Sequence, residues 1–236
     1  MEFISLASSS KGNLYMVKAD GAAPLLIEAG LPLSAIRDKL REHGVSLSDL
    51  AGVLVSHEHL DHARGVKDLL PKGIDCFMSR GTAEELEVWG HYRVHPLFQD
   101  MTEGIGPWRV NVFPLEHDAR EPLGFVVSHG TDRLLFIPDT GIIHHTFTGI
   151  TLAAAEANHV TELLVNNVME GHLPACVGRR IGASHMSLEN LITMLKAQDL
   201  SRCQQIFLLH LSDGNSDEAR MVREVERAVG IPTTAC

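Results

Sequence analysis

Residues 56–62, with the sequence SHEHLDH, constrain this chain more than any other segment. The run holds three histidines and one aspartate in the spacing H-x-H-x-D-H. It directly follows residues 50–55, an apolar and β-branched stretch that predicts a buried strand. Imidazole nitrogens and carboxylate oxygens are the common protein ligands of transition metals. The pattern therefore predicts a strand whose end carries metal ligands, with alternate side chains able to serve two neighbouring metal positions.

Four other predicted strands also end in a side chain that can bind a metal. A single carboxylate after a strand is more often a turn former or a helix cap than a ligand. Four such ends that accompany the dense run at 56–62 are hard to explain by core packing. We therefore expect one shared site, to which these strand ends contribute Glu28, His117, Asp139 and His210.

Composition limits the setting of this site. The 236 residues are 44% hydrophobic and show no linker, repeat or low-complexity segment, which predicts one continuous domain over 1–236. No apolar run approaches the roughly 20 residues of a membrane span, and no signal peptide is recognisable. The four cysteines lack C-x-x-C spacing. We therefore expect a cytoplasmic protein with no membrane partner.

The formal charge of −10 argues against a broad, nonspecific grip on nucleic acid. Bound divalent cations would invert the local field, so a phosphate substrate stays open.

The hydrophobic pattern predicts an α/β protein. Strands in both halves with helices between them favour two sheets packed face to face with helices outside. Arg179 and Arg180, the only adjacent arginines, could contact a phosphate or lie in a solvated loop, and we expect the loop. The predicted strands are 3–7, 14–18, 25–28, 50–55, 74–78, 108–114, 124–128, 134–137, 153–157 and 205–209, and the predicted helices are 33–43, 63–70, 81–89, 188–198 and 218–229.

The ordered strand ends resemble the metallo-β-lactamase superfamily, whose motifs are an acidic strand end, H-x-H-x-D-H, a lone His, a lone Asp and a final His. The resemblance implies an αββα four-layer sandwich, two mixed sheets flanked by helices, with a dinuclear metal site at one edge. Glu28 stands where the family usually has Asp, and would orient a ligand histidine. The implied ligands are His57, His59 and His117 for one metal, Asp61, His62 and His210 for the second, and Asp139 as the bridge.

Mixed nitrogen and oxygen donors suit Zn²⁺, Mn²⁺ or Fe, so we expect two divalent ions per chain whose identity stays open. Two metals about 3.5–4 Å apart generate a hydroxide nucleophile at neutral pH. Asp61 and Asp139 would therefore be catalytic through the metals that they bind.

Further segments resemble the YycJ/WalJ subgroup of single-domain exonucleases within this superfamily. They are SSSKGN at 8–13, HDA at 117–119, EANH at 156–159, SHMS at 184–187 and HLS at 210–212. The resemblance implies a metal-dependent phosphodiesterase, with DNA that has a free 5′ end as the substrate class.

These segments supply the remaining candidate site residues. His185 is a candidate catalytic residue, because an imidazole can protonate a leaving oxygen. Ser187 fits equally well as a helix N-cap, and Asn158 and His159 as hydrogen bonders at the edge of the core. The candidate substrate contacts are Ser9, Asn13, Asn158, His159 and Ser187.

Three functions remain open. The first is a phosphodiesterase that degrades nucleic acid as a 5′-to-3′ DNA exonuclease through a metal-bridging hydroxide, with single-stranded DNA as a candidate partner. The second is a phosphodiesterase for a small cyclic nucleotide, which the acidic charge suits better. The third is a thioester or lactone hydrolase, disfavoured because the two tyrosines, Tyr15 and Tyr92, adjoin no motif. The oligomeric state is open, with a homodimer as one candidate.

Overall fold

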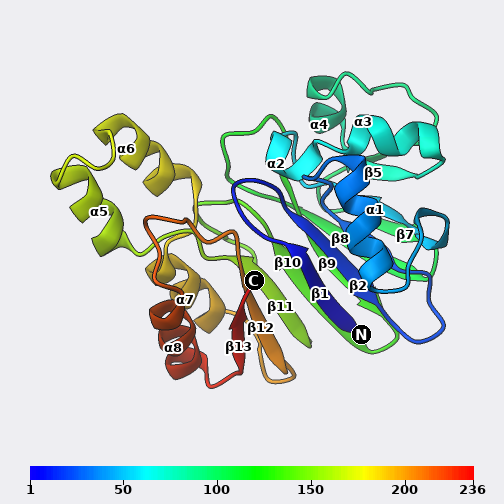
Figure 1. The fold of residues 1–236 in the computed structure, drawn as a ribbon. Helices are drawn as coiled ribbons and strands as arrows, with labels where there is room; N and C mark the ends of the chain where they lie inside the picture. The colour runs from blue at the N-terminus through cyan, green and yellow to red at the C-terminus, as the bar shows by residue number, and fades with distance from the viewer. The chain divides into compact units, whose positions relative to one another are not determined.

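The computed structural model describes residues 1–236 (Figure 1). The internal contacts of the chain divide it into two compact units. Unit 1 comprises Met1–Pro114 and Ala119–Asp132, and unit 2 comprises Leu115–Asp118 and Arg133–Cys236. Each unit contains predicted metal ligands.

The first sheet of the fold lies in unit 1 and contains six strands in sequence order. The strands β1, β2 and β3 pair antiparallel, and β3, β4, β5 and β6 pair parallel, so the sheet is mixed. The bounds are β1 Glu2–Ala7, β2 Leu14–Lys18, β3 Leu25–Ile27, β4 Gly52–Leu54, β5 Cys76–Ser79 and β6 Val94–Leu97.

Helices of unit 1 bury their apolar faces in one core with this sheet. Ile36 and Leu40 of α1 are fully buried in the same cluster as Met16 of β2 and Val53 of β4. The helix α1 comprises Leu33–Glu42, and the other helical elements of unit 1 are shorter: η1 Leu47–Asp49, α2 Leu60–Ala63, α3 Val66–Leu69, η2 Leu70–Lys72 and α4 Arg80–Glu85.

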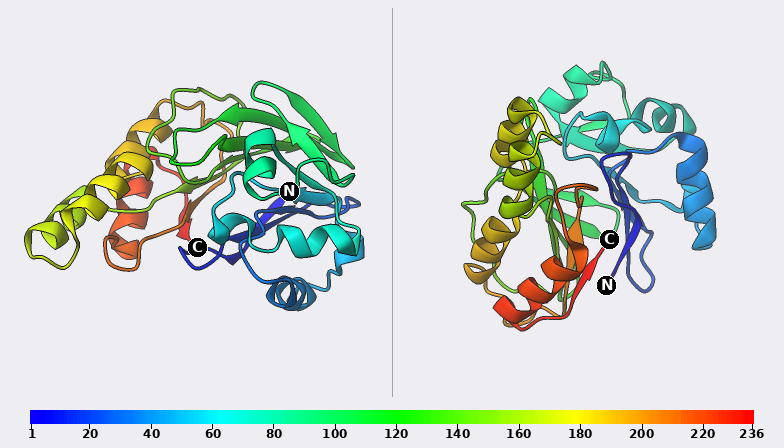
Figure 2. Two further views of the ribbon diagram at one scale, coloured as in Figure 1. Left: turned by 90° about the horizontal axis from the view of Figure 1, so that it is seen from above. Right: turned by 60° about the vertical axis from the view of Figure 1, so that its left-hand side comes forward.

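The second sheet is also mixed. In unit 1, β7 (Thr102–Ile105), β8 (Trp108–Pro114) and β9 (Leu123–His129) pair antiparallel. In unit 2, β10 (Asp132–Ile137), β11 (Leu152–Glu156), β12 (Gln205–Leu209) and β13 (Thr233–Ala235) pair parallel. The helices of unit 2 are α5 Thr161–Met169, α6 Ala175–Ser184, α7 Leu188–Lys196 and α8 Glu218–Val229. In both views of Figure 2, α5 and α6 lie side by side as a helical pair.

The structure confirms the predicted α/β class with two mixed sheets and helices, and it corrects several elements. The loop predicted around Arg179 and Arg180 is wrong, because both lie in α6. The α5–α6 pair was not predicted. Its apolar side chains are mostly uncovered, and the buried residues of α5 and α6 are Leu164, Gly178 and Ser184. The strands β6, β7 and β13 were not predicted either, and the predicted helix 63–70 is interrupted at Gly65 between α2 and α3.

The helices and the cysteines of the structure can be compared with the sequence-based expectations. None of the helices is long and apolar enough to cross a lipid bilayer. All four cysteines are free thiols, and Cys76 alone is buried.

In each unit, parallel strands place side chains that can bind a metal at the same edge of a sheet. The carboxyl ends of β3 and β4 meet in unit 1, and those of β10, β11 and β12 meet in unit 2. Ligand sites of open α/β sheets lie beyond such carboxyl ends. The predicted ligand residues follow these ends, except His117, which follows the antiparallel strand β8.

Candidate metal centre

In unit 1, the ends of β3 and β4 place Glu28 beside the histidine-rich loop. Ile27 pairs with Leu54, so Glu28 leaves the sheet opposite Val55, one residue before Ser56. The backbone N–H of Ser56 donates to Glu28 Oε2 at 3.3 Å, and Glu28 Oε1 lies 3.5 Å from His62 Nδ1. Glu28 is fully buried and has a left-handed backbone, with φ of 68°. Its side chain therefore reaches His62 from a strained backbone position, as the sequence comparison with an acidic strand end implied.

The segment after β3 also positions Asp61 and His62 through its backbone. Ala29 N–H donates to the His62 carbonyl and Asn13 N–H to the Asp61 carbonyl, both at 2.7 Å. A Cβ added at Gly30 would lie 1.7 Å from the Asp61 carbonyl oxygen. Only glycine fits there, so the close approach of these two chain segments holds the ligand loop in place.

The three histidines of the loop gather in unit 1. The ring centroid of His57 lies 4.1 Å from that of His62 and 4.7 Å from that of His59. The Ser56 hydroxyl hydrogen-bonds His57 Nδ1 at 2.8 Å, and Asp61 Oδ2 lies 3.4 Å from His62 Nε2. The loop thus offers three imidazoles and one carboxylate at close range, as the sequence predicts.

In unit 2, Asp139, Glu156 and His210 follow β10, β11 and β12. His210 Nδ1 lies 3.2 Å from both Asp139 Oδ1 and Glu156 Oε1. His185 caps the end of α6, and its Nδ1 lies 2.6 Å from Glu156 Oε1. These four side chains each offer a ligand atom within 4.8 Å of the others, which makes them a candidate metal-binding cluster. His210, like Glu28, has a left-handed backbone, with φ of 55°.

Glu156 is the site residue to which the sequence assigned no role. Its carboxylate is fully buried, and Oε2 accepts the backbone N–H groups of Thr140 and Met186, both at 2.9 Å. Burial and Asp139 act to raise the pKa of Glu156, but the adjacent His185 and His210 outweigh them and hold its pKa below the ordinary value. The sequence feature that could have indicated a role for Glu156 is its position as a carboxylate at the end of an otherwise apolar run, residues 152–156.

His117, in unit 2, has the protonation pattern of a metal ligand. Its Nδ1 lies 2.8 Å from the Ser184 carbonyl oxygen, which can only accept, so Nδ1 carries the proton and Nε2 the lone pair. Nε2 lies 3.8 Å from Asp139 Oδ2. Burial lowers the pKa of His117 despite the nearby Asp139, which favours the neutral ring that metals bind.

The same arrangement recurs at other histidines of the two units. A carboxylate oxygen lies beside Nδ1 of His62, His185 and His210, at 3.5, 2.6 and 3.2 Å. Such oxygens fix the ring orientation of metal-binding histidines. In His185 and His210 this leaves Nε2 for an ion, whereas His62 Nε2 also lies 3.1 Å from Asn13 Nδ2. The donor set of each unit therefore fits divalent metal binding.

The other predicted site residues contact these ligands or one another. Asn13 is buried, and its Nδ2 lies 3.1 Å from His62 Nε2, while Ser9 N–H donates to Asn13 Oδ1. Asn158 Nδ2 donates to the His210 carbonyl at 3.1 Å. His159 bridges to Ser187, which is the N-cap of α7 and accepts the Asn190 N–H. Ser187 thus has its alternative role, and a role of these residues in substrate binding stays a prediction.

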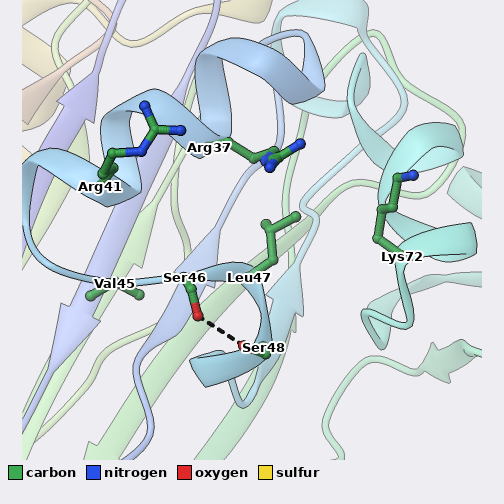
Figure 3. Close-up of a pocket in the computed structure, with 7 residues that line it drawn as sticks. All are labelled: Arg37, Arg41, Val45, Ser46, Leu47, Ser48 and Lys72. Atoms are coloured by element: carbon green, nitrogen blue, oxygen red, sulfur yellow. Dashed lines mark hydrogen bonds between the residues drawn. The ribbon is translucent and has the colours of Figure 1, made fainter.

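A separate cavity in unit 1, of about 480 Å³, contains none of the predicted ligands (Figure 3). Arg37 and Arg41 project from α1 and Lys72 from η2, around a floor that includes Leu47. Arg41 pairs with Asp38 at 2.9 Å. Since no metal-competent histidine lines it, this cavity is not the candidate centre.

A prediction concerns Glu156. We expect Glu156→Gln to lower the free energy of unfolding by about 3 kcal/mol, because a neutral amide leaves buried histidines without their carboxylate partner. Urea denaturation of the metal-free protein measures this. The matched control is Glu116→Gln, an exposed carboxylate of the same unit that pairs with exposed His144, with an expected change within about 0.5 kcal/mol. If Glu156→Gln and Glu116→Gln were equally stable, Glu156 would not stabilise the histidines of the cluster.

Fold and donor set together define a metal-binding hydrolase of the metallo-β-lactamase type. Residues 25–210 match the family model described as a β-lactamase superfamily domain, and the chain belongs to this superfamily. It is 30% identical over 234 residues to exodeoxyribonuclease YycJ of Bacillus anthracis, an alignment that covers 94% of this chain and 87% of that protein.

Solved structures confirm the metallo-β-lactamase fold. The metallo-β-lactamase-fold protein YhfI of Bacillus subtilis superposes with a TM-score of 0.74 at 13% identity, covering 99% of this chain and 95% of that chain. Zn²⁺-bound PqqB of Methylobacterium extorquens superposes with a TM-score of 0.70 at 15% identity, covering 100% and 97%. At these identities the similarity shows the fold alone.

Proposed function

We propose that this protein is a metal-dependent phosphodiesterase that degrades DNA from a free 5′ end. The observation that carries the proposal is a set of histidines whose Nδ1 atoms lie beside oxygen atoms: the Ser184 carbonyl for His117, and the carboxylates of Glu28 and Glu156, which follow β3 and end β11, for His62 and His210. The exodeoxyribonuclease relative, similar over nearly the whole chain, supports nucleic acid as the substrate.

We assign two divalent ions to the chain, with the ligands implied by the family resemblance. His57, His59 and His117 would hold one ion, Asp61, His62 and His210 the other, and Asp139 would bridge them. Because these ligands come from both units, the proposal requires the chain to act as the single domain that its sequence predicts. When bound, such ions supply Lewis acidity and an activated water to phosphodiester hydrolysis. Zn²⁺, Mn²⁺ and Fe all suit this donor set.

The chain's own residues have separate proposed roles. Glu28 orients His62, and Glu156 orients His185 and His210. His185 would donate a proton to the leaving oxygen through Nε2, because Glu156 holds its Nδ1. Burial acts to lower the pKa of His185, but the charge and hydrogen bond of Glu156, with Asp139, raise it above the ordinary value. Ser9, Asn13, Asn158, His159 and Ser187 are the proposed substrate contacts.

The substrate test uses single-stranded DNA labelled at the 5′ end, the same strand labelled at the 3′ end, and cyclic mononucleotides. We expect the 5′ label to leave first as a mononucleotide, while the 3′ label stays on progressively shorter strands. If the 3′ label left first, the protein would degrade DNA from the 3′ end, which would contradict the proposed polarity. Cleavage of the cyclic species alone would reject the exonuclease and favour the small-nucleotide alternative, which the formal charge of −10 supports.

The metal proposal has its own measurement. Elemental analysis of the purified protein is expected to find two divalent ions per chain, and a chelator is expected to abolish hydrolysis of bis(p-nitrophenyl) phosphate until metal is restored. A protein that remains active without metal would exclude the proposed centre.

A further inference from the structure

A second cavity, of about 460 Å³, lies in unit 2 between α5, α6 and the start of α7. Its volume is that of a pocket for a small ligand. Leu164, Val165, Val168 and Met169 line it from α5, and Gly178 and Gly182 from α6. Val165 and Met169 are 48% and 80% exposed, so apolar surface continues to the rim.

The glycines of α6 explain how the cavity forms. At Gly178 the two helices touch, since an added Cβ would lie 2.4 Å from Val168 Cγ2. One turn later, at Gly182, the nearest atom to an added Cβ is Leu164 Cδ2 at 3.8 Å. The helices therefore diverge along α6 and leave space between them.

The inner end of the cavity is polar and contains a buried imidazole that has no hydrogen-bond partner. His159 lines the cavity and is 2% exposed, and its Nδ1 is buried without a partner. Buried polar groups nearly always have partners, and Nδ1 would gain one if the ring turned toward a ligand in the cavity. Asn190 also lines the cavity, and its Nδ2 donates to the Gly141 carbonyl, which leaves the amide oxygen available.

A guanidinium without an ion pair completes the lining. Arg179 is exposed and lines the cavity without a carboxylate partner, whereas its neighbour Arg180 pairs with Asp118 at 2.6 Å. In a chain with a formal charge of −10, an unpaired guanidinium at this position favours a phosphate group.

Two residues that line the cavity follow members of the candidate metal cluster of unit 2 closely in the chain. His159 lies three residues beyond Glu156 on the same strand end, and Ser187 lies two residues beyond His185. The backbones of His159 and Ser187 form a bridge, and both line the cavity. A ligand in the cavity would therefore adjoin the residues assigned to phosphodiester chemistry.

We propose that this α5–α6 cavity binds a nucleobase of the DNA strand next to the scissile phosphate, with Arg179 on that nucleotide's phosphate. The proposal rests on the proposed function. Apolar side chains cover the faces of a base while a few polar groups read its edge, which is how enclosed bases are bound in proteins. His159 and Asn190 would read the edge, and Leu164 and Met169 would cover the faces.

The variants follow from the geometry. Gly182→Leu fills the cavity from a helical position where a Cβ meets only an ordinary contact, and it raises helix propensity. Met169→Glu places a negative charge at an exposed rim position and keeps the core unchanged. Arg179→Gln removes the guanidinium. The matched control is Arg223→Gln on α8, an exposed arginine that does not line this cavity.

The experiment measures binding to the metal-free protein in a chelator, by isothermal titration with thymidine 5′-monophosphate and with base-free deoxyribose 5-phosphate. We expect the nucleotide to bind at least about tenfold more tightly than the base-free ligand, as base stacking contributes. Gly182→Leu and Met169→Glu should abolish that preference, Arg179→Gln should weaken both ligands severalfold, and Arg223→Gln should bind as wild type. Thermal melting confirms that each variant folds.

Equal binding of the two ligands by the wild type, or an unchanged preference in both Gly182→Leu and Met169→Glu, would overturn the proposal. The proposal would also be overturned if a second copy of the chain occupied the cavity. In that case Met169→Glu would change the sedimentation coefficient, and no nucleotide would bind. Because the measurement involves no hydrolysis, its failure is distinct from a failure to degrade DNA.

Discussion

Asp139→Ala abolishes the hydrolysis of bis(p-nitrophenyl) phosphate by the metal-replete protein, with an expected loss of at least about 10³-fold. The proposed centre assigns this carboxylate to both ions, so its loss removes a ligand and a negative charge from each. Stabilisation of several kcal/mol by metal ions corresponds to a rate factor of this size. The measurement is the initial rate at saturating metal, together with the metal content of the variant, which is expected to fall.

The control for this variant is Asp199→Ala. Asp199 is an exposed aspartate of unit 2 whose carboxylate bonds Ser201, and its loss is expected to leave the rate unchanged. In metal-free Asp139→Ala, Glu156 still holds His185 and His210, so we expect the variant to fold. Full activity of a folded Asp139→Ala protein would contradict the ligand assignment.

Among glycine-to-alanine substitutions in unit 1, we expect Gly30→Ala to be the most destabilising. It should lower the free energy of unfolding by more than about 4 kcal/mol or prevent folding. The added Cβ would lie 1.7 Å from the Asp61 carbonyl oxygen and 2.6 Å from the Asn13 backbone nitrogen. Both are backbone atoms, so no side-chain rotation relieves the clash. Urea denaturation, or the soluble yield where the variant does not fold, measures the effect.

Gly104→Ala is the matched control for the added methyl group. Gly104 lies in β7 of the same unit, and a Cβ there meets no atom within 4 Å. We expect a change within about 0.5 kcal/mol. If Gly30→Ala is as stable as Gly104→Ala, the segment after β3 does not hold Asp61 and His62 in the way described.

The ligand-bearing strands could be predicted because each is an apolar run that stops at a charged or imidazole side chain. Buried parallel strands such as β4 and β12 have this form, and their ends are local in sequence. The role of Glu156 could not be predicted because its partners, His185 and His210, lie 29 and 54 residues away. Asn13 is a similar case, since its contact with His62 spans 49 residues.

The α5–α6 pair was missed for a different physical reason. Leu164, Val165, Val168 and Met169 of α5 stand at helical spacing, but of these only Leu164 is buried, and the stripe lines a cavity instead of packing in the core. No helix was predicted for residues 161–184, where the structure forms the walls of this cavity.

Four non-glycine residues of the chain have a left-handed backbone, and two of them are Glu28 and His210, one at the candidate centre of each unit. Each such residue costs about 1–2 kcal/mol relative to an ordinary conformation, which glycine would avoid. Selection for thermal stability alone would therefore replace both side chains. Under the proposed ligand assignment, a stabilised descendant or a consensus redesign of this protein would lose the acidic strand end and the final histidine early, and we expect a gain in melting temperature at either position to come with a loss of activity.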